Sequence, residues 1–159
     1  MSAQPTDELL ATVASIDLLS NALRSLNTAI SSERASERYV AAHIAALRAA
    51  AALLASHAQP NKRRPTSVWV LLVNRFPEFS EWAQFFTVTA KKRAAAEAGV
   101  RDAVTPREAD DLVRDAQDFI DAVTEKLGIS RQLTLPVQNA TFVEPHAKSN
   151  VLQFKSRTA

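Results

Sequence analysis

Apolar residues recur every three or four positions over residues 6–30, a spacing that predicts a first amphipathic helix. Its predicted buried stripe consists of Leu9, Val13, Ile16, Leu19, Leu23, Leu26 and Ile30. Ser31 and Ser32 interrupt the pattern, and Ser36 is placed to cap a second helix over residues 37–58. The predicted stripe of that helix consists of Val40, Ile44, Leu47, Ala51, Leu54 and Ala58.

Prolines and glycines divide the middle of the chain. Residues 59–66 contain two prolines and a basic triplet, which predicts an exposed loop. A third helix is expected to begin near Ser67 and to break at Pro77, because a proline inside a helix removes a hydrogen bond and clashes with the preceding turn. An apolar pattern rich in aromatic residues follows and ends at Gly99.

The last helix has the clearest boundaries. Thr105 is placed to cap it, with Pro106 at the first helical position, Glu108 completing a capping box and Gly128 ending the helix. The predicted buried stripe consists of Ala109, Leu112, Val113, Ala116, Phe119, Ile120, Val123 and Leu127.

From Ile129 onward the helical period disappears, and Pro136 and Pro145 interrupt a polar segment. We therefore expect a flexible N-terminus over residues 1–7, an all-α, up-and-down bundle of four to five helices over residues 8–128, and an extended, disordered tail over residues 129–159.

The composition agrees with an all-α fold and excludes several chemistries. The chain has 29 alanines and only 2 glycines, which favours helices over hairpin turns. It has no cysteine, which excludes disulfides and thiolate chemistry and suits the cytoplasm, where we expect the protein. The three histidines lie far apart in the sequence, so we expect no metal and no cofactor. We also expect no membrane span and no export signal.

The charges are strongly segregated along the chain. Residues 1–33 carry a net charge of −3, residues 34–107 carry +7, residues 108–129 carry −5 and residues 130–159 carry +3. A basic middle segment suggests contact with nucleic acid. The candidate nucleic-acid-binding residues are Arg34, Arg48, Lys62, Arg63 and Arg64.

Four blocks of sequence carry a resemblance to a known family. They are ERYVAAHIAALRAAAA at residues 37–52, RRPTSVW at 63–69, EWAQFF at 81–86 and TPREADDLVRD at 105–115. Together they resemble a HEPN-domain family of high-GC bacteria over about residues 8–128. This resemblance implies an up-and-down helical bundle that often forms a homodimer.

Many HEPN domains share an R-x(4 to 6)-H signature used for metal-independent RNA cleavage, and Arg38 and His43 match that spacing. The resemblance implies that the histidine would transfer a proton at the ribose 2′-hydroxyl and that the arginine would stabilise the charged phosphate. On a regular helix, however, side chains five residues apart point about 140° away from each other. The alternative is that His43 edges the core and that Arg38 pairs with a carboxylate.

The tail contains a second motif, Q-L-T-L-P-V at residues 132–137. It is similar to the short peptides with which bacterial replication and repair proteins dock on the DNA sliding clamp. Such a segment would insert its apolar side chains into preformed pockets. The candidate partner-binding residues are Gln132, Leu133, Leu135, Pro136 and Val137. The alternative is that the apolar residues of this segment fold back on the bundle.

These observations predict a HEPN-like, nucleic-acid-associated binding module without catalytic activity, which recruits a protein partner through its tail. One alternative is a metal-independent endoribonuclease that uses Arg38 and His43. Another is a helical partner or antitoxin-like protein.

Overall fold

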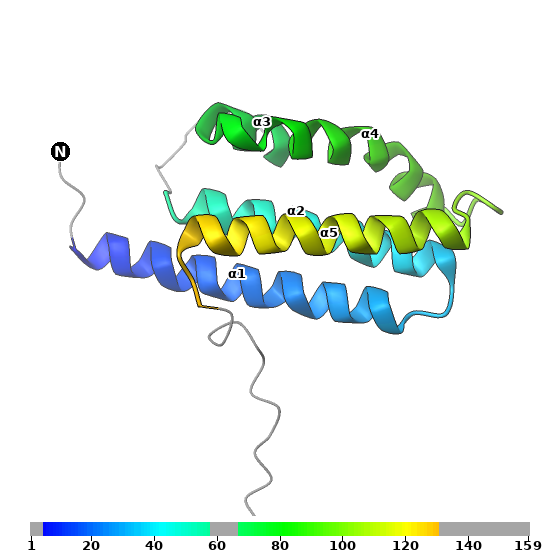
Figure 1. The fold of residues 1–159 in the computed structure, drawn as a ribbon, viewed down its shortest axis with the longest axis horizontal. Coiled ribbons are helices and arrows are strands. Elements are labelled where there is room, and N and C mark those ends of the chain that lie inside the picture. Colours follow the sequence, from blue (N-terminus) through cyan, green and yellow to red (C-terminus); the bar gives the residue numbers. More distant parts are fainter. Residues whose placement is uncertain (1–4, 58–66, 131–159) are drawn as a thin grey trace, which may run out of the picture.

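The computed structural model describes residues 5–57 and 67–130, and all regular elements in these ranges are helical (Figure 1). The elements are α1 (Pro5–Ser31), α2 (Ala35–Ala55), α3 (Val68–Arg75), the short 3₁₀ helix η1 (Pro77–Phe79), α4 (Ser80–Glu97) and α5 (Pro106–Leu127). The prediction of an all-α fold is confirmed.

The helices α1, α2, α4 and α5 alternate in direction, so the molecule is an up-and-down bundle (Figure 1). Helix α2 is central, because α1, α3, α4 and α5 all pack against it. Helix α1 lies on one side of α2, and α3 and α4 lie on the other (Figure 1). Helix α5 contacts both α1 and α2.

The structure corrects two predictions for α2. Its buried residues are Tyr39, Ala42, His43, Ala45, Ala46, Ala49, Ala50, Ala52 and Leu53. The predicted stripe beginning at Val40 and Ile44 is only half-buried. The fully buried residues lie on several faces of α2, because other helices pack around it. The predicted cap was also wrong, since Arg34 occupies the N-cap position and Ser36 lies inside the helix. Ala58, the predicted end of α2, lies outside the described residues.

The predicted stripe of α1 is wrong at both ends of the helix. Leu9, Val13 and Ile30 are exposed to solvent. The buried residues of α1 are instead Ser15, Leu19, Ala22, Ser25, Leu26 and Ala29. Small side chains thus form much of the face that packs on α2, which permits the two helices to approach closely.

Local signals determine the remaining boundaries as expected. Ser67 caps α3 by accepting a hydrogen bond from the Trp69 backbone N–H at 3.3 Å. Pro77 ends this segment and opens η1. Gly99 follows α4 with a φ of +72°, a conformation that favours glycine.

Helix α5 agrees with its prediction in detail. Thr105 and Glu108 form the capping box, and Gly128 ends the helix with a φ of +64°. The predicted stripe is buried except at Val113 and Leu127, which are partly buried against the core.

The side of the core formed by α3, η1, α4 and α5 is aromatic. Phe119 of α5 lies in ring contact with Trp69, Phe79, Trp82 and Phe86. The rings of Trp69 and Phe86 stack with centroids 5.0 Å apart. Large rings therefore join α4 to α5, whose backbones approach each other less closely than those of α1 and α2.

Helices α1 and α2 are long and apolar enough to cross a membrane by length and composition alone. Half of the apolar stretch of α2 is buried inside the bundle, as in the core helix of a globular protein. The absence of a membrane interaction therefore stays a prediction.

Candidate functional site

Arg38 lies in the first turns of α2 and joins three parts of the molecule. Its Nε donates to the Ser32 carbonyl at 3.2 Å, and Nη2 donates to the Glu33 carbonyl at 3.1 Å. Its Nη1 forms an ion pair with Asp110 of α5. The side chain is 20% exposed. Arg38 thus binds the connection between α1 and α2 to α5, and these three contacts use three of its five N–H donors.

His43 is only 1% exposed and lies in the aromatic side of the core. Its Nε2 is 2.9 Å from the Phe86 carbonyl oxygen of α4, and the imidazole packs nearly perpendicular to the Trp69 and Phe86 rings. A carbonyl accepts hydrogen bonds, so Nε2 carries the proton in this arrangement. Nδ1 is buried without a hydrogen-bond partner. Burial lowers the pKa of His43, which favours the neutral imidazole.

The structure does not bring Arg38 and His43 together. Arg38 contacts the α1–α2 connection and α5, whereas His43 contacts α3 and α4. The charged residues that influence the pKa of His43 are Arg93 and Glu97 of α4. Arg93 pairs with Glu97 at 3.0 Å. The catalytic assignment of Arg38 and His43 stays a prediction.

The two described nucleic-acid candidates lie apart. Arg34, at the start of α2, is largely exposed and pairs with Glu37 at 3.5 Å. Arg48 lies 14 positions later, about 21 Å along the helix axis. It donates to the Ser25 hydroxyl of α1 and so links α2 to α1. The other candidates, Lys62, Arg63 and Arg64, lie outside the described residues, as do Gln132, Leu133, Leu135, Pro136 and Val137 of the tail.

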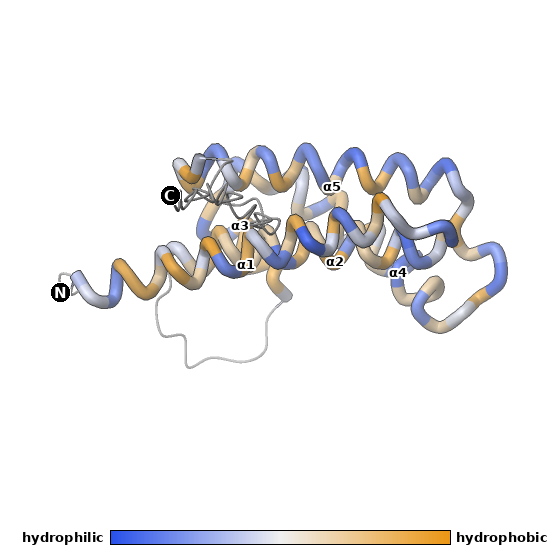
Figure 2. Tube along the Cα trace, turned by 90° about the horizontal axis from the view of Figure 1, so that it is seen from below, coloured by the Kyte–Doolittle hydropathy of each residue, from blue (hydrophilic) through white to orange (hydrophobic). Residues whose placement is uncertain are grey.

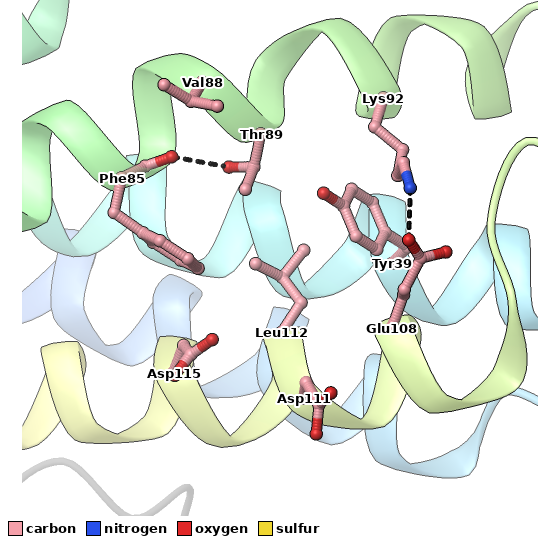
Figure 3. A pocket seen from close by; sticks show the side chains of 9 residues that line it. All are labelled: Tyr39, Phe85, Val88, Thr89, Lys92, Glu108, Asp111, Leu112 and Asp115. Atoms are coloured by element: carbon pink, nitrogen blue, oxygen red, sulfur yellow. Dashed lines mark hydrogen bonds and ion pairs between the residues drawn. The ribbon is translucent and has the colours of Figure 1, made fainter.

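A cleft that the sequence did not predict lies between α4 and α5 (Figure 3). It has a volume of about 280 Å³ and is lined by side chains from α2, α4 and α5. Phe85 and Leu112 form apolar walls, and the buried Tyr39 ring comes from α2. Lys92 of α4 and Glu108 of α5 form an ion pair across it (Figure 3).

Glu108 has two structural roles beside the cleft. The Lys92 ammonium, together with the Thr105 backbone N–H and hydroxyl, lowers the pKa of Glu108 to about 2. The same carboxylate therefore caps α5 and holds α5 to α4.

The α5 rim of the cleft is acidic. Burial raises the pKa of Asp115, and the neighbouring Asp111 and Asp118 carboxylates raise it further. A second hollow of about 320 Å³ continues from Asp115 toward Glu81 and Trp82. The acidic face of α5 was visible in the sequence. Its position opposite the aromatic residues of α4 was not, because that depends on how the two helices pack.

Within residues 5–57 and 67–130, no group of three or more histidine, aspartate or glutamate side chains is arranged to hold a metal ion. The expectation that no metal takes part stays a prediction.

The fold and the site together define a small all-α bundle domain whose two signature residues lie on different sides of its central helix. A family model described as SAV_6107-like HEPN matches residues 29–124 of the chain. The chain belongs to this HEPN family. No curated protein and no solved structure matches it.

Proposed function

We propose that the chain is a non-catalytic, nucleic-acid-associated binding module of the HEPN family, which recruits a protein partner through its tail. The position of His43 carries the non-catalytic part of this proposal. A general base must reach the proton that it removes, directly or through one water. His43 is 1% exposed, and its protonated Nε2 is directed at the Phe86 carbonyl.

The surroundings of Arg38 support the same conclusion. The contacts with Ser32, Glu33 and Asp110 use three of the five N–H donors of Arg38 and hold its guanidinium against the α1–α2 connection and α5. Catalysis would also require Arg38 to lie near His43, whose side chain contacts α3 and α4 instead. The two residues serve the packing of the bundle instead.

RNA cleavage by the purified protein in metal-free buffer tests this part of the proposal. We expect the same background rate for the parent, Arg38→Ala and His43→Gln, in which glutamine keeps a donor for the Phe86 carbonyl. Circular dichroism controls for the fold of each variant. Cleavage by the parent that both substitutions abolish without loss of helix would contradict the proposal and favour the endoribonuclease.

The nucleic-acid part rests on the net charge of +7 over residues 34–107. Binding through Lys62, Arg63 and Arg64 would release counterions from the phosphate backbone, so its affinity should fall steeply with salt. Replacing all three residues by alanine should weaken binding and reduce the salt dependence. The matched control replaces Arg75, Arg101 and Arg107, which are exposed on the described surface. An equal loss in both triple variants would show that net charge, rather than residues 62–64, determines binding.

The partner-recruiting part rests on Q-L-T-L-P-V at residues 132–137. We propose that Leu133, Leu135 and Val137 enter apolar pockets of a bacterial sliding clamp and that Gln132 supplies orienting hydrogen bonds. A homodimer would present two tails to one ring and increase the apparent affinity.

Binding of the full-length chain to a purified bacterial clamp tests the tail. Substituting Gln132 and Leu135 together by alanine should abolish binding. Substituting the neighbouring Gln138 and Asn139 should leave it nearly unchanged. If the parent does not bind the clamp, this assignment of the partner is wrong.

A further inference from the structure

The first turns of α1 expose an apolar surface that no described part of the chain covers. Leu9, Leu10 and Val13 are 64%, 65% and 49% exposed, respectively. Their spacing places them on one face of the helix, because residues three and four positions apart are neighbours on its surface. Figure 2 shows this apolar end of α1 projecting beyond the other helices. We call Leu9, Leu10 and Val13 the α1 patch.

The chain leaves the bundle at the same end. Helices α1 and α5 run in opposite directions, so α1 begins and α5 ends at the same end of the bundle, where α1 projects further (Figure 1). After Gly128, the Ile129 backbone N–H donates to the Thr124 carbonyl at 3.2 Å, and the Ile129 side chain packs against the core. The last described residues then run from the end of α5 toward the side of the bundle on which α1 lies (Figure 1).

The reach of the tail exceeds the length of α1 that projects beyond its buried part. The buried part of α1 begins at Ser15, and Leu9 lies six positions before it, about 9 Å along the helix axis. Residues 133–137 follow Ser130 by three to seven positions, which correspond to about 10–23 Å of extended chain.

The two segments also match in chemistry. Residues 133–137 read L-T-L-P-V and carry three large apolar side chains, as the α1 patch does. The charges are opposite, since residues 1–33 carry −3 and residues 130–159 carry +3. Asp7 and Glu8 stand next to the α1 patch, and Arg131 stands next to the apolar part of the tail.

We propose that residues 133–137 of the tail bind the α1 patch of the same chain. Leu133, Leu135 and Val137 then cover Leu9, Leu10 and Val13. This contact buries the side chains with which the tail would dock on a partner. Intramolecular binding and partner docking therefore compete, a consequence that rests on the proposed function of the tail.

Cysteine cross-linking tests the intramolecular contact without any partner, because the chain contains no cysteine. The test variant carries Thr6→Cys and Thr134→Cys. The matched control carries Thr28→Cys and Thr134→Cys, because Thr28 is also exposed on α1 but lies about 33 Å further along the helix. Under mild oxidation, we expect the test variant to form an intramolecular disulfide at least tenfold faster than the control.

Two further variants separate a bound tail from a tail that merely begins nearby. Adding Leu9→Ser and Leu10→Ser to the test variant should slow the cross-link at least fivefold. Both leucines are exposed, so the helix content should not change. Replacing Leu133, Leu135 and Val137 by serine should have the same effect.

Cross-linking that neither set of serine substitutions slows would overturn the proposal, as would disulfides that form only between two chains. The second result would assign the α1 patch to a second copy of the protein. Since no clamp is present, the result is independent of whether the tail binds one. If the tail does bind a clamp, Leu9→Ser and Leu10→Ser should strengthen that binding.

Discussion

The two sides of α2 are packed in different ways. On the α1 side, small residues such as Ala22, Ser25 and Ala29 are buried, and the helices pack closely. On the other side, Trp69, Phe86 and Phe119 hold α3, α4 and α5 together through ring contacts. Close packing of small residues leaves little room for a site. Large rings separate the helices, bury His43 and leave a cleft between α4 and α5.

The largest expected effect concerns the aromatic side. Phe119→Ala removes a fully buried ring that contacts four other aromatic residues. We expect the free energy of unfolding to fall by about 3–5 kcal/mol, because the cavity cannot fully collapse. Urea unfolding followed by circular dichroism measures the change. The exposed Gln117→Ala on the same helix is the control, and an equal effect of both substitutions would contradict the packing described here.

The α1 side should be sensitive to added volume. Ala22→Leu inserts three carbon atoms at a fully buried position, and we expect a loss of about 1–3 kcal/mol from overpacking. Ala14→Leu, on the exposed part of α1, should change the free energy of unfolding by less than about 0.5 kcal/mol. If Ala22→Leu is neutral, the helices are not closely packed at this position.

Protonation of His43 should destabilise the aromatic side. Its pKa is lowered in the folded state, so the unfolded chain binds the proton more readily. The contribution of neutral His43 to the free energy of unfolding should be fully present above the unfolded pKa of about 6.5. It should decrease as the pH falls from there toward the lowered pKa of the folded state. The slope is at most about 1.4 kcal/mol per pH unit for one proton. In His43→Gln this part of the pH dependence should disappear, and an unchanged slope would show that another group causes it.

The smallest expected effect concerns the N-terminal cap of α5 beside the cleft. Thr105→Ala removes the side-chain cap of α5, and we expect a loss of about 1 kcal/mol. Thr12→Ala is a suitable control, because Thr12 is exposed in the middle of a helix and bonds only the preceding turn. Thermal melts of both variants would separate the cap from a general loss of threonine. Equal melting temperatures would mean that the cap does not stabilise α5.

The sequence predicted α5 well because its signals are local. The capping box and Gly128 act within a few residues, and α5 has one apolar face and one acidic face. The same reasoning failed for α1, where the predicted stripe included Leu9 and Val13. A periodic pattern identifies a helical face that is able to pack, but only the neighbouring helices determine how much of it is covered.

The candidate site could be predicted only in part. The spacing of Arg38 and His43 on one regular helix predicts that they diverge, and the structure places them on different sides of α2. The partners of these residues, Asp110 and the Phe86 carbonyl, could not be predicted, since they belong to helices far away in the sequence. The cleft between α4 and α5 was missed for the same reason.

The state of the His43 imidazole distinguishes a buried histidine that is unavailable for catalysis from a catalytic histidine that RNA can reach. Nitrogen-15 NMR of the histidine side chains, with His43 assigned through His43→Gln, reports the tautomer, the pKa and any response to RNA. We predict a neutral imidazole protonated at Nε2, a pKa below 6.5 and no change when RNA is added. An imidazole that titrates as in a solvent-exposed histidine and shifts on addition of RNA would instead show that His43 is accessible and available for catalysis.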